Sequence, residues 1–213
     1  MKILKKTKSP EKKNIILIEK KPEKYDKTVL IIGVFHGDEP EGEALIDKFL
    51  ENFPTKTKNR LLILPCLNPD GKALKTRQNI NRVDLNRNFP TKNWELVREK
   101  EYFGGFEPAS EIETKFLVEI LDENKIDAIL SLHTPYKIIN YDGPAKELAE
   151  KISELTQYPV QEDIGYPTPG SFGTYAGVER EIPTITLELP ENENFSKLWT
   201  KNKQVFEFFA NIF

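Results

Sequence analysis

The chain has 213 residues, long enough to bury one sizeable core, and a single domain covering residues 1–213 is expected. Lys and Arg total 31 and Asp and Glu total 34, and this near-balance gives no reason to expect a nucleic-acid partner. Cys66 is the only cysteine and no apolar run approaches the ~20 residues of a membrane span, so an internal disulfide and a transmembrane helix are excluded.

The first predicted elements lie in the N-terminal third of the chain. The lysine-rich head "MKILKKTKSPEKK" (1–13) lacks the apolar segment of a signal peptide and is expected to be a solvated basic tail. Residues 14–19 and 28–35 are β-rich runs, divided by a polar connection that contains proline. Residues 41–53 place apolar side chains at helical spacing. The absence of a signal segment and the single cysteine predict a cytoplasmic protein.

The remaining elements alternate between strands and helices. Residues 60–71 are predicted to form a strand that the turn signal Asn-Pro-Asp-Gly stops. Ser110 and Glu113 could form a capping box, which predicts a helix over residues 110–125. Further strands are expected at residues 126–135 and 183–190, and further helices at residues 145–157 and 195–213. This alternation predicts an α/β fold with a largely parallel sheet covered on both faces.

Two histidines, the only ones in the chain, each follow an apolar strand: "TVLIIGVFH" ends at His36 and "IDAILSLH" ends at His133. Ligands bind beyond the carboxyl ends of strands in an open α/β sheet, so the two imidazoles could converge. His36 and Glu39 form an H-x-x-E pair, which alone could be a simple hydrogen-bonded pair. Two histidines and one glutamate are also the protein ligands of a catalytic zinc ion, and the second strand-end histidine favours that interpretation.

A carboxylate within an apolar strand is the next candidate. Glu188 lies among Ile185, Leu187 and Leu189 in "PTITLELP". It could form a structural ion pair with Arg87 or Arg180, or it could be a general base that takes a proton from water.

The irregular region 72–109 is too long for an ordinary connection and is therefore suspected to be functional. Asn86 and Arg87 are adjacent, which suits recognition of a carboxylate by an amide and a guanidinium fork. Arg77 could stabilise an oxyanion, and Asp84 could orient a metal-bound histidine. Each of these residues taken singly could be an ordinary surface charge.

Six segments in order resemble the zinc metallocarboxypeptidases, the carboxypeptidase A-like family: "HGDE", "NPDG", "TRQN", "VDLNRNFP", "SLHTP" and "GYPTPGSFGTYAGVEREIPTITLELP". The resemblance covers residues 28–190, and within the family it is strongest to the murein tripeptide amidase branch. It implies a single three-layer α/β/α domain with a mixed, mostly parallel sheet and one catalytic Zn2+.

The resemblance also implies roles for individual residues. The zinc ligands would be His36, Glu39 and His133. Glu188 would be the general base and Arg77 would hold the oxyanion. The α-carboxylate of the substrate would bind Asn86 and Arg87, and Asp84 would support a zinc-bound histidine. Tyr166 matches the tyrosine that closes over substrate, with Tyr175 as a rival.

The substrate is less well indicated than the chemistry. The resemblance implies a small peptide, most specifically the γ-D-glutamyl–meso-diaminopimelate bond of murein peptides. A general carboxypeptidase, an aspartoacylase or succinylglutamate desuccinylase acting on N-acyl amino acids, and a non-catalytic binder of cell-wall fragments are the alternatives. Gly173, at a position that shapes the pocket of larger relatives, supplies no charge, and Asp38, Glu41 and Glu43 could meet a substrate amine or simply begin a helix.

Overall fold

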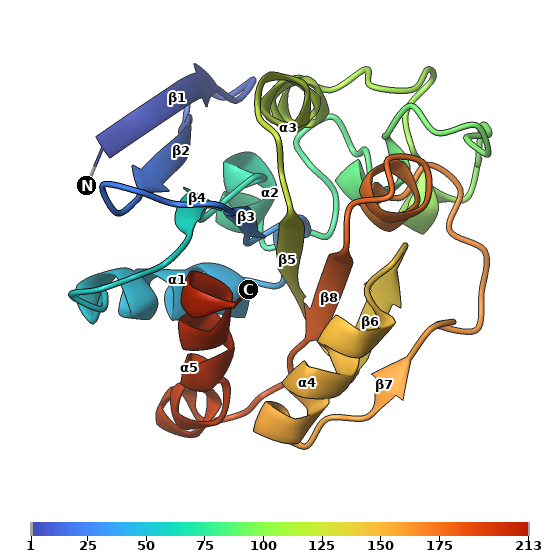
Figure 1. Cartoon of the computed structure of the whole chain (residues 1–213). Helices are drawn as coiled ribbons and strands as arrows, with labels where there is room; N and C mark the ends of the chain where they lie inside the picture. The colour runs from blue at the N-terminus through green and yellow to red at the C-terminus, as the bar shows by residue number, and fades with distance from the viewer. Residues whose placement is uncertain (1, 213) are drawn as a thin grey trace.

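The computed structural model describes residues 2–212 and arranges their eight strands in one mixed sheet. The strand order is β1-β2-β4-β3-β5-β8-β6-β7 (Figure 1). The strands are β1 (Lys2–Lys8), β2 (Asn14–Lys20), β3 (Thr28–Ile32), β4 (Arg60–Leu64), β5 (Ala128–His133), β6 (Ile139–Asp142), β7 (Val160–Gln161) and β8 (Thr184–Glu188). Residues 1 and 213, the outer ends of the predicted tail and of the predicted last helix, lie outside the described residues.

The centre of the sheet is parallel, as the sequence predicts. β4, β3, β5 and β8 are parallel neighbours, and antiparallel strands flank them on both sides. Every residue of β3 and of β5 is buried, because the helices and loops on both faces of the sheet cover them. The continuous apolar runs that identified these strands in the sequence therefore reflect burial on both sides.

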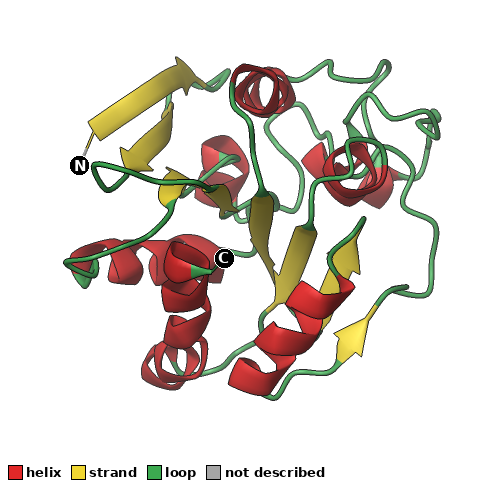
Figure 2. Ribbon diagram, viewed as in Figure 1, coloured by secondary structure: helices red, strands yellow, loops and turns green. Residues whose placement is uncertain are grey.

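The helices form two layers around this sheet (Figure 2). The elements are α1 (Glu41–Glu51), α2 (Pro69–Leu74), α3 (Ile112–Glu123), α4 (Lys146–Thr156) and α5 (Phe195–Asn211), with the short helices η1 (Leu85–Arg87), η2 (Lys100–Tyr102) and η3 (Gly173–Val178). Side chains of α1, α4 and α5 pack on one face in one apolar cluster, and those of α3 and η3 pack on the other face. Among residues 2–212, no helix combines the length and apolarity needed to cross a bilayer.

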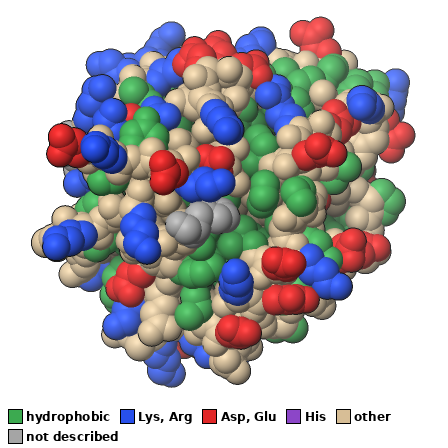
Figure 3. All heavy atoms as spheres, in the orientation of Figure 1, with side chains coloured by type: hydrophobic (Ala, Val, Ile, Leu, Met, Phe, Trp, Pro, Cys, Tyr) green, Lys and Arg blue, Asp and Glu red, His purple; other side chains and the backbone are tan. Residues whose placement is uncertain are grey.

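The lysine-rich head is a strand in the structure and the prediction of a solvated tail was wrong. Lys2–Lys8 pairs antiparallel with β2, and its lysines gather over that edge of the molecule (Figure 3, upper left). The backbone of an edge strand can pair on one side while its charged side chains stay in water. Charge alone therefore does not distinguish an edge strand from a tail.

Two local sequence motifs, a turn motif and a helix-capping motif, were also misinterpreted. The Asn-Pro-Asp-Gly turn begins helix α2, where Asn68 is the N-cap and accepts a hydrogen bond from the amide of Gly71 at 2.9 Å. Helix α3 begins at Ile112 without a side-chain cap. Ser110 donates to Glu111 instead, and Glu113 is buried, so the predicted capping box does not form.

Besides β1, two further strands, β6 and β7, were not predicted. β6 is antiparallel to β8, with Ile139 opposite Leu187 and Asp142 opposite Thr184. Polar residues at Asn140 and Asp142 interrupt the apolar run of β6, because these side chains face a cavity and not the core. This cavity lies at the carboxyl ends of β5 and β8, where the candidate site residues meet.

Candidate active site

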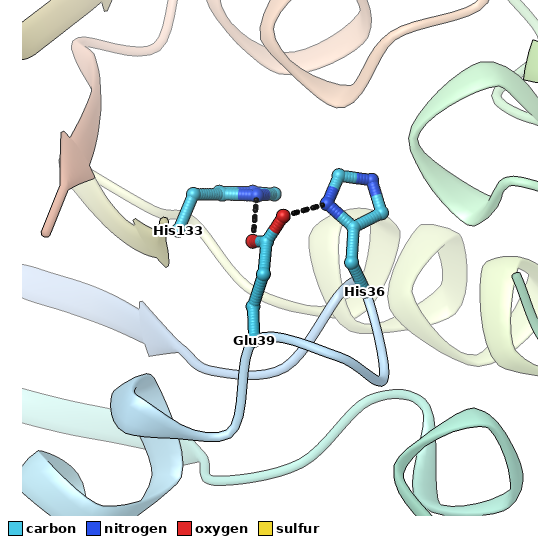
Figure 4. A group of neighbouring side chains, drawn as sticks. All are labelled: His36, Glu39 and His133. Carbon is cyan, nitrogen blue, oxygen red and sulfur yellow. Dashed lines mark hydrogen bonds and ion pairs between the residues drawn. The ribbon is translucent and has the colours of Figure 1, made fainter. Parts of the chain in front are cut away.

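Three predicted ligands meet at the carboxyl ends of β3 and β5 (Figure 4). The carboxylate of Glu39 lies between the two imidazoles, 2.8 Å from Nδ1 of His36 and 3.1 Å from Nδ1 of His133. One ligand atom from each of the three side chains lies within 4.8 Å of the others. His133 comes from the last position of β5, and the other two come from the loop that follows β3.

The loop that carries His36 and Glu39 is held against α2. A side chain at Gly37 would overlap the backbone of Gly71, so the two segments approach as closely as glycine allows. Asn68, the N-cap of α2, also donates its amide to the carbonyl oxygen of Phe35 at 3.1 Å. The Asn-Pro-Asp-Gly segment therefore positions the first two candidate ligands.

The electrostatics of the cluster are dominated by buried pairs. Burial disfavours a charge on His36, but the carboxylates of Glu39 and Asp84 outweigh burial and raise the pKa of His36 to about 9. Burial likewise acts against ionisation of Glu39, yet the two imidazoles hold its pKa well below the usual range. The carboxylates that favour a proton on His36 would equally favour a metal cation in place of that proton.

The donor set fits zinc. Two imidazole nitrogens and one carboxylate oxygen are borderline and hard donors that suit Zn2+, and three protein ligands leave a position for water or substrate. Asp84 is fully buried and its Oδ1 lies 3.2 Å from Nε2 of His36, on the ring atom that does not face Glu39. Such a contact fixes the orientation of an imidazole ligand.

Glu188 lies beside this cluster. It is the last residue of β8 and is the register partner of His133 across the β5–β8 pair. Its Oε2 is buried without a hydrogen-bond partner, and burial raises the pKa of Glu188. Neither of the ion pairs considered from the sequence is made among the described residues, since Arg180 pairs with Asp122 and Arg87 donates to the carbonyl of Asn86.

Arg77 also contacts the cluster. Its Nε donates to Oδ2 of Asp84 at 3.0 Å, and its Nη1 lies 3.4 Å from Nδ1 of His36 and 3.8 Å from Oε1 of Glu39. Because Asp84 contacts both His36 and Arg77, this one carboxylate sets the position of a candidate metal ligand and of a candidate oxyanion donor.

Asn86 and Arg87 line the same cavity from η1. Arg87 is buried, and among the described residues its guanidinium has one hydrogen bond, to the carbonyl of Asn86, and no carboxylate partner. The side-chain oxygen of Asn86 accepts from the amide of Phe172 at 2.9 Å. The ring of Tyr102 lies 5.6 Å from the guanidinium carbon of Arg77 and 5.6 Å from that of Arg87, so it contacts both cations.

The two tyrosine candidates lie in different places. Tyr166 is partly exposed, lines the cavity, and has its ring 6.4 Å from that of Tyr102. Tyr175 is buried, packs on Phe89 and accepts a hydrogen bond from Arg180. Tyr175 does not line the cavity, so of the two only Tyr166 can reach a substrate there.

The cavity has a volume of about 510 Å³ and contains side chains that the sequence did not single out. Tyr102 and Asp142 are the main ones, along with Tyr136. Of the acids noted at the start of α1, Asp38 and Glu41 line the cavity, whereas Glu43 pairs with Lys72. A polar residue alternating with apolar ones, as in "IINYD", was the available signal for Asp142; no local pattern marks Tyr102.

Comparison with known proteins agrees with this geometry. The family model described as zinc carboxypeptidase matches residues 1–158. The murein peptide amidase A of Vibrio campbellii is 35% identical over 174 residues, covering 76% of this chain and 68% of its own. The enzyme of the same name from Escherichia coli K12 is 34% identical over 173 residues, covering 76% of this chain and 70% of its own.

Solved structures give the same picture at the level of the fold. The murein-tripeptide amidase of Escherichia coli O157 superposes with a TM-score of 0.83 at 27% identity, covering 95% of this chain and 89% of the other. The carboxypeptidase A of Helicoverpa armigera superposes with a TM-score of 0.79 at 16% identity, covering 98% of this chain and 68% of the other. These matches confirm the predicted three-layer fold with a mixed sheet.

Proposed function

This chain belongs to the zinc carboxypeptidase family and is a zinc-dependent hydrolase of peptide bonds, and from that premise we propose that its substrates are murein peptides. The bond cut would be that between γ-D-glutamate and meso-diaminopimelate, at the C-terminal end of a small peptide. The names of the relatives, murein peptide amidase A and murein-tripeptide amidase, support this choice of substrate.

One observation carries the proposal: the same cavity holds a buried carboxylate oxygen without a hydrogen bond and a buried guanidinium without a carboxylate partner. Oε2 of Glu188 accepts no hydrogen bond, and the guanidinium of Arg87 has no carboxylate among residues 2–212. A buried cation or carboxylate without a partner costs free energy. A peptide with a free C-terminal carboxylate and a reacting water would supply both partners.

Each residue near the cluster has a proposed role. His36, Glu39 and His133 would hold the zinc ion, which supplies a Lewis acid for the carbonyl and makes water nucleophilic at neutral pH. Glu188 would take the proton of the attacking water and later give a proton to the leaving amine. Its burial and raised pKa support a group that takes up a proton more readily than an exposed glutamate does.

The cations of the cavity would bind the substrate. Arg77 would donate to the carbonyl oxygen as negative charge develops there, held in place by Asp84. Arg87 and Asn86 would bind the α-carboxylate, which restricts cleavage to the bond before the last residue. Tyr166 would contact the bound peptide from the open side of the cavity.

The experiment is a comparison of three substrates with and without a chelator. The zinc-loaded protein is incubated with L-Ala-γ-D-Glu-meso-diaminopimelate, with a peptide ending in an aromatic residue, and with N-acetyl-aspartate. We expect free diaminopimelate by mass spectrometry from the first substrate, and loss of that product when zinc is removed. Turnover of N-acetyl-aspartate alone would reject the proposal in favour of an N-acyl amino acid hydrolase.

The proposal also includes the domain organisation and the cellular location of the enzyme. Residues 1–213 would act as one catalytic domain, supported by a single sheet and by a cavity lined from residue 36 to residue 192. A cytoplasmic location remains part of the proposal and is supported by cysteine usage, since Cys66 is the only cysteine and is buried as a free thiol.

A further inference from the structure

The floor of the cavity is a polar face of the sheet. Alternate residues of three neighbouring strands face the cavity: Ser131 and His133 from β5, Thr186 and Glu188 from β8, and Asn140 and Asp142 from β6. The residues between them, among them Leu132 and Leu187, point into the apolar core on the other side. The cavity therefore extends along the strands, from the three candidate metal ligands towards Asp142.

Asp142 lies at the far end of this floor. It is opposite Thr184 in the β6–β8 register, and Glu188 is four residues further along β8, a distance of about 13 Å between backbones at ~3.3 Å per residue. Side chains from both positions reach into the space between them. A substrate residue whose α-carbon lies near Glu188 would thus direct its side chain towards Asp142.

The carboxylate of Asp142 has no partner in the protein. Among residues 2–212 it accepts no hydrogen bond and forms no ion pair, and burial raises the pKa of Asp142 to about 6, so it is still mainly ionised at pH 7. Of the described residues that line the cavity, the only lysine or arginine side chains are those of Arg77 and Arg87, which lie beside the Tyr102 ring and form no ion pair with Asp142. The charge of Asp142 is therefore left for a ligand.

Helix η3 makes room for this carboxylate. A methyl group on Gly173 would overlap the carboxylate oxygen of Asp142, and one on Gly177 would overlap its Cβ. Both glycines thus allow η3 to pack directly on Asp142 while its carboxylate stays on the cavity side. Gly173 supplies no charge of its own, but it is required for the charge opposite it.

We propose that Asp142, with Gly173 leaving space for it, binds an ammonium group at the end of the side chain of the substrate's C-terminal residue. A single carboxylate is too few ligands for a divalent metal ion, whereas it is a sufficient partner for one ammonium group. Lysine carries such a group at the end of a methylene chain, and diaminopimelate carries one there on a carbon that also bears a carboxylate. The inference rests on the proposed function, because it assumes that a C-terminal residue occupies this cavity.

The test measures kcat/KM on three peptides of the form L-Ala-γ-D-Glu-X, where X is meso-diaminopimelate, L-lysine or L-norleucine. Norleucine has an apolar side chain of similar length to that of lysine and lacks the ammonium group. Wild-type enzyme is expected to prefer lysine over norleucine by about tenfold to a hundredfold, the range for a hydrogen bond between charged groups. Asp142→Asn should abolish this preference, slow the diaminopimelate peptide by the same factor, and leave the norleucine rate within about threefold.

Two further variants separate the charge of Asp142 from the general acidity of the cavity. Glu191→Gln removes an exposed acid from the rim of the same cavity and should keep the lysine preference. Gly173→Ala should lose the preference as Asp142→Asn does, and the double variant should lose no more than either alone, because both changes act on one carboxylate.

The binding of free amino acids is measured as well, so that failure of the proposed function and failure of the proposed role of Asp142 can be told apart. Calorimetry with zinc-loaded protein should show that free L-lysine binds more tightly than L-norleucine, and that Asp142→Asn removes the difference. Hydrolysis of the norleucine peptide without any lysine preference would overturn the role of Asp142 and leave the hydrolase intact. If no peptide is hydrolysed, the proposed function fails, and the lysine-binding comparison still decides the role of Asp142. An unchanged diaminopimelate rate in Asp142→Asn would overturn its assignment to the murein substrate.

Discussion

Glu113 in α3 is a buried carboxylate whose oxygens accept no hydrogen bond, and replacing it should stabilise the protein. The side chain is fully buried and neither of its oxygens accepts a hydrogen bond. The nearby amide of Asn79 already donates to Glu111 at 2.8 Å. Burial, together with the negative charges of Glu111 and Asp70, raises the pKa of Glu113 to about 7. The folded state therefore resists ionisation of this group.

The sign and size of the effect follow from that pKa. An acid whose pKa is raised by folding costs nothing well below its unfolded pKa of 4.5, and the cost grows as pH rises from there to about 7. At about 1.4 kcal/mol per pKa unit, the raised pKa of Glu113 lowers the free energy of unfolding by about 3 kcal/mol at pH 8 and by about 1 kcal/mol at pH 5. Glu113→Gln keeps the shape and removes the charge, so its advantage over wild type should grow by about 2 kcal/mol between these pH values.

Urea denaturation of zinc-loaded wild type and variant at both pH values measures this difference. Glu119→Gln, an exposed acid on the same helix that pairs with Lys5, is the matched control and should change stability by less than about 1 kcal/mol at either pH. A Glu113→Gln effect of equal size at pH 5 and pH 8 would refute the reasoning, because only ionisation of this carboxylate makes the effect depend on pH.

The other predictions concern catalysis and are measured as steady-state kinetics on the murein tripeptide. Glu188→Gln should lower kcat by about 10²–10⁴ with zinc content, read by metal analysis, unchanged. Arg77→Gln should lower kcat by about 10²–10³, as expected for a lost oxyanion donor. A kcat of the variant equal to that of wild type would reject the role of Arg77 as that donor. Arg87→Gln should mainly raise KM, because its proposed contact is to the α-carboxylate of the substrate in ground and transition states alike. Tyr102→Ala should lower kcat/KM by about tenfold, since its ring contacts both guanidinium groups, while Tyr102→Phe keeps the ring and should stay near wild type.

The strands that the sequence predicted are those whose neighbours cover both faces. β3 and β5 are continuous apolar runs because no residue in them meets water. β6 was not predicted because it is only four residues long and alternates apolar residues with Asn140 and Asp142. In a surface strand this alternation means contact with solvent, and here it means contact with the cavity. A pattern of hydrophobicity cannot distinguish these two environments.

The candidate ligands could be found because each is attached to a strand end, where the fold itself brings positions together. Tyr102 had no such signal: it lies in an irregular segment, and its approach to Arg77 and Arg87 depends on the path of that whole segment. The capping box at Ser110 and Glu113 failed for a related reason. Both residue types suit a helix N-terminus, but burial of Glu113 is decided by what packs against α3.

The relation of Glu188 to His133 depends on strand register, which the sequence does not specify locally. "TITLEL" alternates polar and apolar side chains, so the sequence predicts a polar face of β8 that includes Glu188. In the same way it predicts a face of β5 that includes Ser131 and His133. Pairing places Glu188 directly beside His133, and a slip of one residue would turn Glu188 towards the core formed by Leu132 and Leu187. The apolar residues of the opposite face therefore help to fix the geometry of the proposed site, because a one-residue slip would turn them towards the cavity and Glu188 into the core.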